Sequence, residues 1–115
     1  VLGFKKLPVK IKAEVINDTT IIPDNKTVKL NFKALVFPLV LRRWENGDKF
    51  MPLGMKGFKK VSDFLTGIKM PLFEKDKVWL LVNGNGEIIW VTGFRIDERF
   101  KITPKTKSVL KLVIS

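Results

Sequence analysis

Short stretches of alternating apolar and polar residues, separated by turn-forming residues, most strongly constrain what this chain can fold into. Residues 9–15 place every second, apolar side chain on one face, and residues 28–33 repeat this pattern. A two-residue repeat of this kind is typical of a β-strand with one buried face. Residues 83–86, Asn-Gly-Asn-Gly, separate two further strand patterns at 78–82 and 87–91 and predict a hairpin.

One segment changes from this repeat to helical spacing. Val61, Phe64, Leu65 and Ile68 stand at positions i, i+3, i+4 and i+7, so they share one face of a short helix that Pro71 would end. The remaining patterns predict a buried strand over residues 37–41, a loop over 52–58, an exposed charged stretch over 95–101 and a last strand over 109–114. Together they predict a single α+β domain over residues 1–115, a strand-rich, compact, sandwich-like fold with one or two short helices.

Positive charge is the strongest feature of the composition. The 22 Lys and Arg residues exceed the 11 Asp and Glu residues, which gives a formal net charge of +11. Such a surface attracts polyanions over long distances, so nucleic acid is favoured over two alternatives, an unspecific lysine-rich surface and an anionic membrane. The apolar runs are too short to cross a bilayer, so no membrane span is expected.

The sequence contains no Cys and no His, which restricts its chemistry. No disulfide or thiolate metal site can form, and a reducing, cytoplasmic location is expected. Without His the usual proton shuttle and the commonest metal ligand are missing. Carboxylates such as Asp97 and Glu98 are interpreted as solvated or paired with nearby basic residues, so no catalytic or metal site is predicted. Because the chain begins with Val1 and not Met, we expect it to be a piece of a longer protein whose other part holds the catalysis.

Residues 54–60, Gly-Met-Lys-Gly-Phe-Lys-Lys, form the strongest candidate binding site. The two glycines are too close together for a P-loop, and no Gly-Lys-Ser/Thr follows, so no ATP site is implied. Instead, Gly54 and Gly57 would let the backbone approach a phosphate, and the amides of the predicted helix would point at it. Lys56, Lys59 and Lys60 would supply positive charge. The alternative is that these lysines simply extend into water.

Two further basic clusters contain aromatic residues. They are Arg42 and Arg43 beside Trp44, and Arg95, Arg99 and Lys101 around Phe100. Arg can bind a phosphate through two parallel hydrogen bonds, whereas large rings in a small domain are usually needed for packing. We therefore expect the two rings to be core residues. We also expect one arginine of each cluster to point inward to a carboxylate, such as Asp48, Asp63 or Asp97.

The region from Phe37 to Lys107 resembles a known family. The residues that carry the resemblance are Phe37-Pro38-Leu39, Arg42, Trp44, Gly47-Asp48, Phe50, Pro52-Leu53-Gly54-Met55-Lys56-Gly57, Lys59-Lys60, Ser62-Asp63-Phe64 and Lys69, then Gly86-Glu87-Ile88, Trp90-Val91, Gly93, Arg95-Ile96-Asp97, Arg99-Phe100-Lys101, Thr103 and Thr106. This pattern is similar to the C-terminal domain of bacterial tRNA(Ile)-lysidine synthetases, also called synthases. Residues 1–36 are less diagnostic, and Trp79 stands where many relatives have a proline.

The resemblance implies a role within a larger enzyme. Members of this family use ATP to adenylate the wobble cytidine of a minor isoleucine tRNA and then attach lysine. That chemistry, with its ATP, magnesium and lysine, belongs to an N-terminal catalytic domain whose Ser-Gly-Gly-x-Asp-Ser loop this sequence lacks. The C-terminal domain is implied to be a β-rich sandwich related to one in the phenylalanyl-tRNA synthetase β chain, to hold no cofactor, and to help recognise the tRNA acceptor stem. The tRNA-binding positions that carry over are Arg42, Lys56, Lys59, Lys60, Lys69, Arg95 and Arg99.

A competing hypothesis makes the chain a structural module. In that case it would dock on the N-terminal catalytic domain of the same enzyme, or on a second copy in a homodimer, and its charge would be incidental. This hypothesis predicts an exposed apolar patch and little affinity for tRNA. The sequence leaves both hypotheses open.

Overall fold

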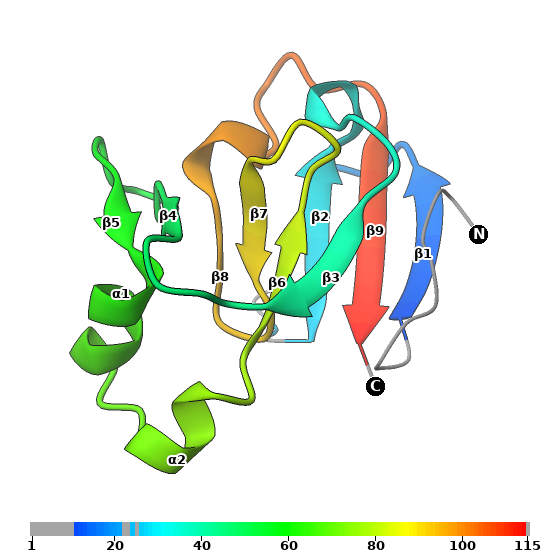
Figure 1. Ribbon diagram of the computed structural model, residues 1–115. Helices are drawn as coiled ribbons and strands as arrows, with labels where there is room; N and C mark the ends of the chain where they lie inside the picture. The colour runs from blue at the N-terminus through cyan, green and yellow to red at the C-terminus, as the bar shows by residue number, and fades with distance from the viewer. Residues whose placement is uncertain (1–10, 22–23, 25, 115) are drawn as a thin grey trace.

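The computed structural model describes residues 11–21, 24 and 26–114, and these residues form antiparallel sheets accompanied by short helices (Figure 1). The strand orders are β1-β9-β2 in the first sheet, β3-β6-β7-β8 in the second and β4-β5 in the third. The strands are β1 (Ile11–Ile16), β2 (Thr27–Asn31), β3 (Val40–Arg43), β4 (Lys49–Phe50), β5 (Lys59–Lys60), β6 (Trp79–Val82), β7 (Ile88–Val91), β8 (Arg95–Ile96) and β9 (Val109–Ile114). The helices are α1 (Val61–Gly67) and α2 (Leu72–Lys75), with 3-10 turns η1 (Phe32–Ala34) and η2 (Glu98–Phe100).

The first sheet packs against one face of the second and forms a sandwich with a shared core. Leu110 and Leu112 of β9 and Leu30 of β2 meet Leu81 and Trp90 of the second sheet, and all are buried. The predicted strands are confirmed as β1 and β2, but the predicted alternation is only partly formed. Ile11 and Ala13 are half-buried beside exposed Lys12 and Glu14, whereas Val15 is 48% exposed and no residue of β2 is exposed. The second strand ends at Asn31, where a 3-10 turn follows, and residues 9 and 10 lie outside the described residues.

The other face of the second sheet is covered by the β4–β5 hairpin and by α1. Val61, Phe64 and Leu65 of α1 are buried there, as the helical spacing predicted, and Phe64 packs edge-on against Phe50 with ring centroids 5.2 Å apart. Burying each of these side chains stabilises the fold by about 1.5–3 kcal/mol. Because β6 and β7 lie between two cores, their sequences read as continuous apolar runs and not as alternating ones.

Several expectations were wrong in detail, and each has a local reason. The strand predicted at 37–41 begins only at Val40, because Pro38 has no N–H to donate to a neighbouring strand. Ile68 lies beyond the end of α1 and is 41% exposed, so it does not join the helix face. The stretch 95–101, predicted to be exposed, contains Asp97 and Phe100, which are fully or almost fully buried.

The hairpin predicted between 78–82 and 87–91 and the last strand at 109–114 are confirmed as β6–β7 and β9. In the described residues, no helix is long and apolar enough to span a membrane.

Candidate functional site

The β4–β5 hairpin presents lysines on its outer side. In its register Lys49 stands opposite Lys60, and both are exposed, whereas Phe50 opposite Lys59 is buried. Two like charges directly across an antiparallel pair destabilise it by about 0.2–1 kcal/mol. No carboxylate forms an ion pair with Lys49 or Lys60 within the described part of the chain. The hairpin therefore carries local charge repulsion that a bound anion would relieve.

The turn between the two strands is fixed by backbone hydrogen bonds. Gly54 has a φ of 88°, a conformation that favours glycine, and its N–H donates to Glu98 Oε1 at 2.9 Å. The N–H of Leu53 donates to the carbonyl of Ile96 at 3.0 Å. The Gly54 amide therefore donates within the protein, and the approach of a phosphate to this backbone stays a prediction. Lys56 lies exposed in the same turn.

Lys59 does not lie at the start of α1 as the sequence predicted. Lys59 belongs to β5, and its side chain reaches Gly67, the last residue of α1. A Cβ atom placed on Gly67 would lie 3.7 Å from Lys59 Nζ. The ammonium group therefore lies at the C-terminal end of α1, where the partial negative charge of the helix favours a cation. The amide of Val61, at the helix start, donates to the Asp48 carbonyl at 2.9 Å. Lys60 is the N-cap of α1, as the sequence predicted, but the ammonium group of Lys59 lies at the other end of the helix and does not join it there.

Arg42 forms an internal ion pair. Its Nη1 and Nη2 donate to Oδ2 and Oδ1 of Asp48, each at 2.9 Å, and the same carboxylate accepts the N–H of Glu45 at 2.7 Å. The hydrogen bonds that Arg42 donates to Asp48 raise the pKa of Arg42 above its ordinary value. Partial burial acts to raise the pKa of Asp48, but the bonds from Arg42 and Glu45 outweigh it and hold that pKa below its ordinary value. Arg42 thus positions the 45–48 turn that leads into β4.

Arg99 is bound still more completely. Its Nε and Nη2 donate to the two oxygens of Asp97 at 2.9 Å, and its Nη1 donates to Glu87. Asp97 has no exposed surface and also accepts the N–H of Met51 at 2.8 Å. The prediction that one arginine of each cluster turns inward to a carboxylate is confirmed, with Asp48 and Asp97 as the partners.

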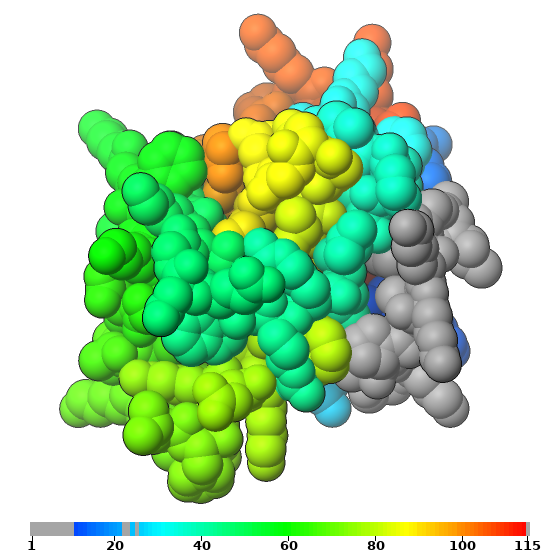
Figure 2. Space-filling view, in the orientation of Figure 1, coloured from blue at the N-terminus to red at the C-terminus, as the bar shows by residue number. Residues whose placement is uncertain are grey.

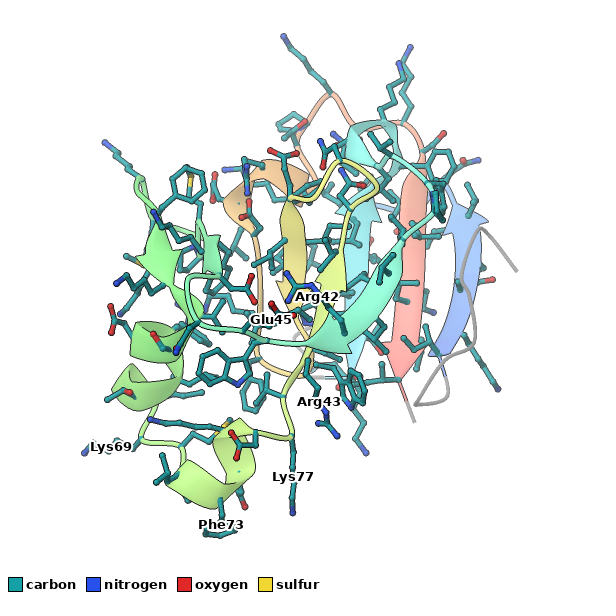
Figure 3. All side chains as sticks on the ribbon, viewed as in Figure 1. Arg42, Arg43, Glu45, Lys69, Phe73 and Lys77 are labelled. Carbon is teal, nitrogen blue, oxygen red and sulfur yellow. The ribbon has the colours of Figure 1, made fainter. Side chains whose placement is uncertain are left out.

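Arg95 and Lys69 are the two remaining tRNA-binding positions that the family resemblance predicted, and both are exposed. Arg95 lies over the Phe64 ring, 5.5 Å from its centroid, and has no ion pair among the described residues. Lys69 has a φ of 60° and points outward from the connection between α1 and α2, away from Arg42 (Figure 3). The predicted residues therefore separate into two arginines bound internally and five basic residues without a carboxylate partner in the described chain, which are Lys56, Lys59, Lys60, Lys69 and Arg95.

The aromatic residues of the two basic clusters belong to the core, as expected. Phe100 is buried, and half-buried Trp44 donates its Nε1 hydrogen to the Lys75 carbonyl at 2.6 Å. Trp79, the departure from the family pattern, is half-buried opposite Arg43, whose guanidinium lies 4.0 Å from the ring centroid. This contact gives Arg43 a packing role.

Sequence reasoning missed Lys49 and Phe58. Lys49 lies opposite Lys60 only because β4 pairs with β5, and no local sequence pattern predicts that pairing. Phe58 is 58% exposed in the turn between the two strands, and Arg99 lies 5.0 Å from its ring centroid. Figure 2 shows the segment that contains the hairpin, the turn and α1 along one side of the molecule, in green.

Two hollows accompany these residues. One, of about 360 Å³, lies beside Phe58 and Arg99 and is also lined by Lys49, Asn85 and Glu87. The other, of about 570 Å³, lies between the edge strands β2 and β8 and has a mostly apolar lining. The described residues contain no group of three carboxylate, His or Cys side chains that could hold a metal ion.

Comparison with known proteins identifies relatives that match most of this chain. The family model described as "TilS substrate C-terminal domain" matches residues 39–113. A tRNA(Ile)-lysidine synthase of Parabacteroides distasonis is 43% identical over 109 residues, which are 95% of this chain and 23% of the relative. One from Clostridium acetobutylicum is 47% identical over 76 residues, which are 66% of this chain and 16% of that protein. The chain spans about a quarter or less of the length of these relatives.

Two solved structures share the fold. A crystal structure of a TilS C-terminal domain superimposes with a TM-score of 0.81 at 21% identity, over 95% of this chain and 88% of that one. An N-terminal fragment of the phenylalanyl-tRNA synthetase β-subunit from Pyrococcus horikoshii gives a TM-score of 0.65 at 21% identity, over 77% of this chain and 28% of that one. These matches confirm the predicted strand-rich, sandwich-like α+β fold with short helices.

Proposed function

Because the chain belongs to the tRNA(Ile)-lysidine synthase family, as the C-terminal domain of such an enzyme, we propose that it binds tRNA at the acceptor stem. The family membership supports tRNA as the substrate class, and the lysine-bearing hairpin supports this surface as the binding site. The observation that carries the proposal is the exposed Lys49–Lys60 pair, with Lys56 in the adjoining turn and no carboxylate paired with any of them in the described chain.

These side chains suit an RNA duplex. In A-form RNA the major groove is too deep and narrow for side chains to read, so a protein binds the duplex mainly through its shape, phosphates and 2′-hydroxyls. Lysine ammonium groups on a short rigid hairpin can contact neighbouring phosphates. The hairpin itself is held by Arg42 through Asp48 and by Arg99 through Asp97, so these two arginines support the surface from inside. Lys59, Lys69 and Arg95 remain predicted tRNA contacts at its edges.

The proposal places the enzyme's chemistry outside this chain. The adenylation of cytidine and the attachment of lysine, with their ATP and magnesium, are assigned to the N-terminal catalytic domain. This chain would hold the tRNA by its acceptor stem while the anticodon lies in that domain. Its contribution is positioning, which lowers the entropic cost of bringing the distant wobble base to the reacting groups.

Salt dependence of binding tests the proposal directly. The affinity of the chain for an acceptor-stem minihelix should fall steeply with salt, because each phosphate contact releases counterions. Changing Lys49, Lys56 and Lys60 together to Gln should flatten the slope of log affinity against log salt by about two units. Wild type should also bind the minihelix more tightly than an anticodon stem-loop. Equal affinity for the two RNAs would reduce the interaction to unspecific charge attraction.

A matched control removes the same charge elsewhere. Lys33, Lys77 and Lys105 are exposed and lie outside the hairpin, and Lys77 points downward from the bottom of the view, away from the hairpin (Figure 3). Changing these three to Gln should leave the slope within about half a unit of wild type. A slope that responds equally to both triple variants would show that the hairpin is not the binding surface.

One observation favours a second candidate function. Leu72 and Phe73 of α2 are 80% and 70% exposed, which is the apolar patch that a docking or dimerisation module would need. If this were the main role, changing both to Ser would abolish a concentration-dependent dimer, or docking on the separately purified catalytic domain, and tRNA affinity of the chain would be weak.

A further inference from the structure

We propose that Phe58 is a stacking platform for one unstacked RNA base, with Arg99 holding its ring from behind. This inference rests on the proposed RNA-binding function and adds a specific subsite to it. Phe58 is 58% exposed, although burying a Phe side chain would stabilise the fold by about 1.5–3 kcal/mol. It lines the same hollow as Lys49, so an RNA held by this lysine of the hairpin would pass close to the ring.

Arg99 gives the ring a fixed support. All its hydrogen-bonding is directed to Asp97 and Glu87, so the guanidinium is not available as a mobile phosphate ligand. Its central carbon lies 5.0 Å from the centroid of Phe58, within the range of a cation–π contact. Since Asp97 is fully buried, this support is anchored in the core. An exposed ring backed in this way offers a stacking surface with little conformational entropy to lose.

The hollow beside the ring is open to solvent and has a mainly polar lining. Its volume of about 360 Å³ lies within the usual range for small-molecule sites. Asn85 lines it and provides an amide, whose Nδ2 donates to Glu87 Oε1 at 2.9 Å and whose Oδ1 accepts the Glu87 N–H at 3.0 Å. Lys49 also lines it and can contact the nucleotide's phosphate. A base on Phe58 would therefore have a polar edge and a cation within reach.

An exposed base at the end of a stem has two sources. It can be an unpaired nucleotide of a single-stranded 3′ extension, or it can belong to the terminal base pair of the duplex. Stacking chemistry is the same for both, because every base has a π-face. A blunt minihelix and the same minihelix with a four-nucleotide 3′ extension distinguish them.

The experiment measures the affinity of the chain for these two RNAs. If a 3′ nucleotide occupies the platform, wild type should bind the extended RNA about ten-fold more tightly than the blunt one. Phe58→Ala should abolish this gain while leaving affinity for the blunt RNA within about two-fold. Phe58→Trp should preserve the gain. If the terminal base pair occupies the platform instead, wild type shows no gain from the extension, and Phe58→Ala lowers the affinity for both RNAs by about ten-fold.

Phe94→Ala is the control, because Phe94 is another exposed aromatic, at 45%, and lines the separate groove between β2 and β8. It should change neither affinity. A base analogue, 2-aminopurine, in the extension should lose fluorescence on binding to wild type but not to Phe58→Ala. If Phe58→Ala changes the affinity for neither RNA, or if only Phe94→Ala removes the gain from the extension, the platform assignment is wrong, although the hairpin still binds RNA. Failure of wild type to bind either RNA would instead overturn the proposed function itself.

Discussion

Replacing Asp97 with Asn should lower the free energy of unfolding by about 3 kcal/mol. The Asp97 carboxylate accepts hydrogen bonds from the N–H of Met51, the N–H of Arg99, and the Nε and Nη2 of Arg99, at 2.8–2.9 Å. Asn keeps one acceptor oxygen, but its NH₂ group would face two donors, the Met51 N–H and Arg99 Nη2. Each bond to a charged group is worth about 1.5–3 kcal/mol, and each buried donor left unpaired costs about 1–3 kcal/mol.

The expected value lies at the low end of the range for breaking a buried ion pair, about 3–5 kcal/mol. The reason is that the Arg99 side chain is 29% exposed and can recover part of its hydration. Urea unfolding measures the change. With a slope of about 1.5 kcal/mol per molar urea, the midpoint should fall by about 2 M. Asp76→Asn, at an exposed position, is the control and should change stability by less than about 0.5 kcal/mol.

A double-mutant cycle tests whether Asp97 stabilises the fold through its ion pair with Arg99. In an Arg99→Gln background the carboxylate has lost its charged partner, so Asp97→Asn should cost at least about 1 kcal/mol less than it does in wild type. The same cost in both backgrounds would mean that Asp97 acts independently of Arg99. A loss below about 1 kcal/mol in wild type would mean that the hydrogen bonds of Asp97 contribute little to stability.

Two further predictions concern acid stability and backbone packing. Hydrogen bonds from Arg42 hold the pKa of Asp48 below its ordinary value despite partial burial, so their stabilisation is complete above about pH 5 and is lost as the pH falls from there through the lowered pKa of the folded state. Asp48→Asn should therefore cost about 1 kcal/mol at pH 7 and flatten the fall in thermal stability below about pH 5; an unchanged pH profile would contradict it. Gly84→Ala should destabilise by more than about 2 kcal/mol, because its Cβ would lie 2.4 Å from the backbone carbonyl oxygen of Val36. Gly57→Ala, with nothing within 4 Å and no positive φ, should be neutral in the same thermal unfolding assay, and similar losses in the two variants would refute the steric reason.

The sequence alone determined the features that depend on near neighbours in the chain. The Asn-Gly-Asn-Gly turn with its flanking apolar runs predicted the β6–β7 hairpin, because a tight turn and two strands are set within about a dozen residues. The spacing of Val61, Phe64 and Leu65 predicted the buried face of α1. Net charge predicted an anionic partner, and the motif from Gly47 to Phe64 identified the family.

Only the tertiary structure decided what each basic residue does. Lys49 faces Lys60 because β4 pairs with β5, and Arg99 turns inward because Asp97 is buried next to Met51, 46 positions earlier in the chain. Both arrangements are selected by the burial of distant apolar side chains, which outweighs the local preference of a charged residue for water. For that reason the sequence shows which residues are basic, but only the fold separates those that form internal ion pairs from those without an ion pair among the described residues.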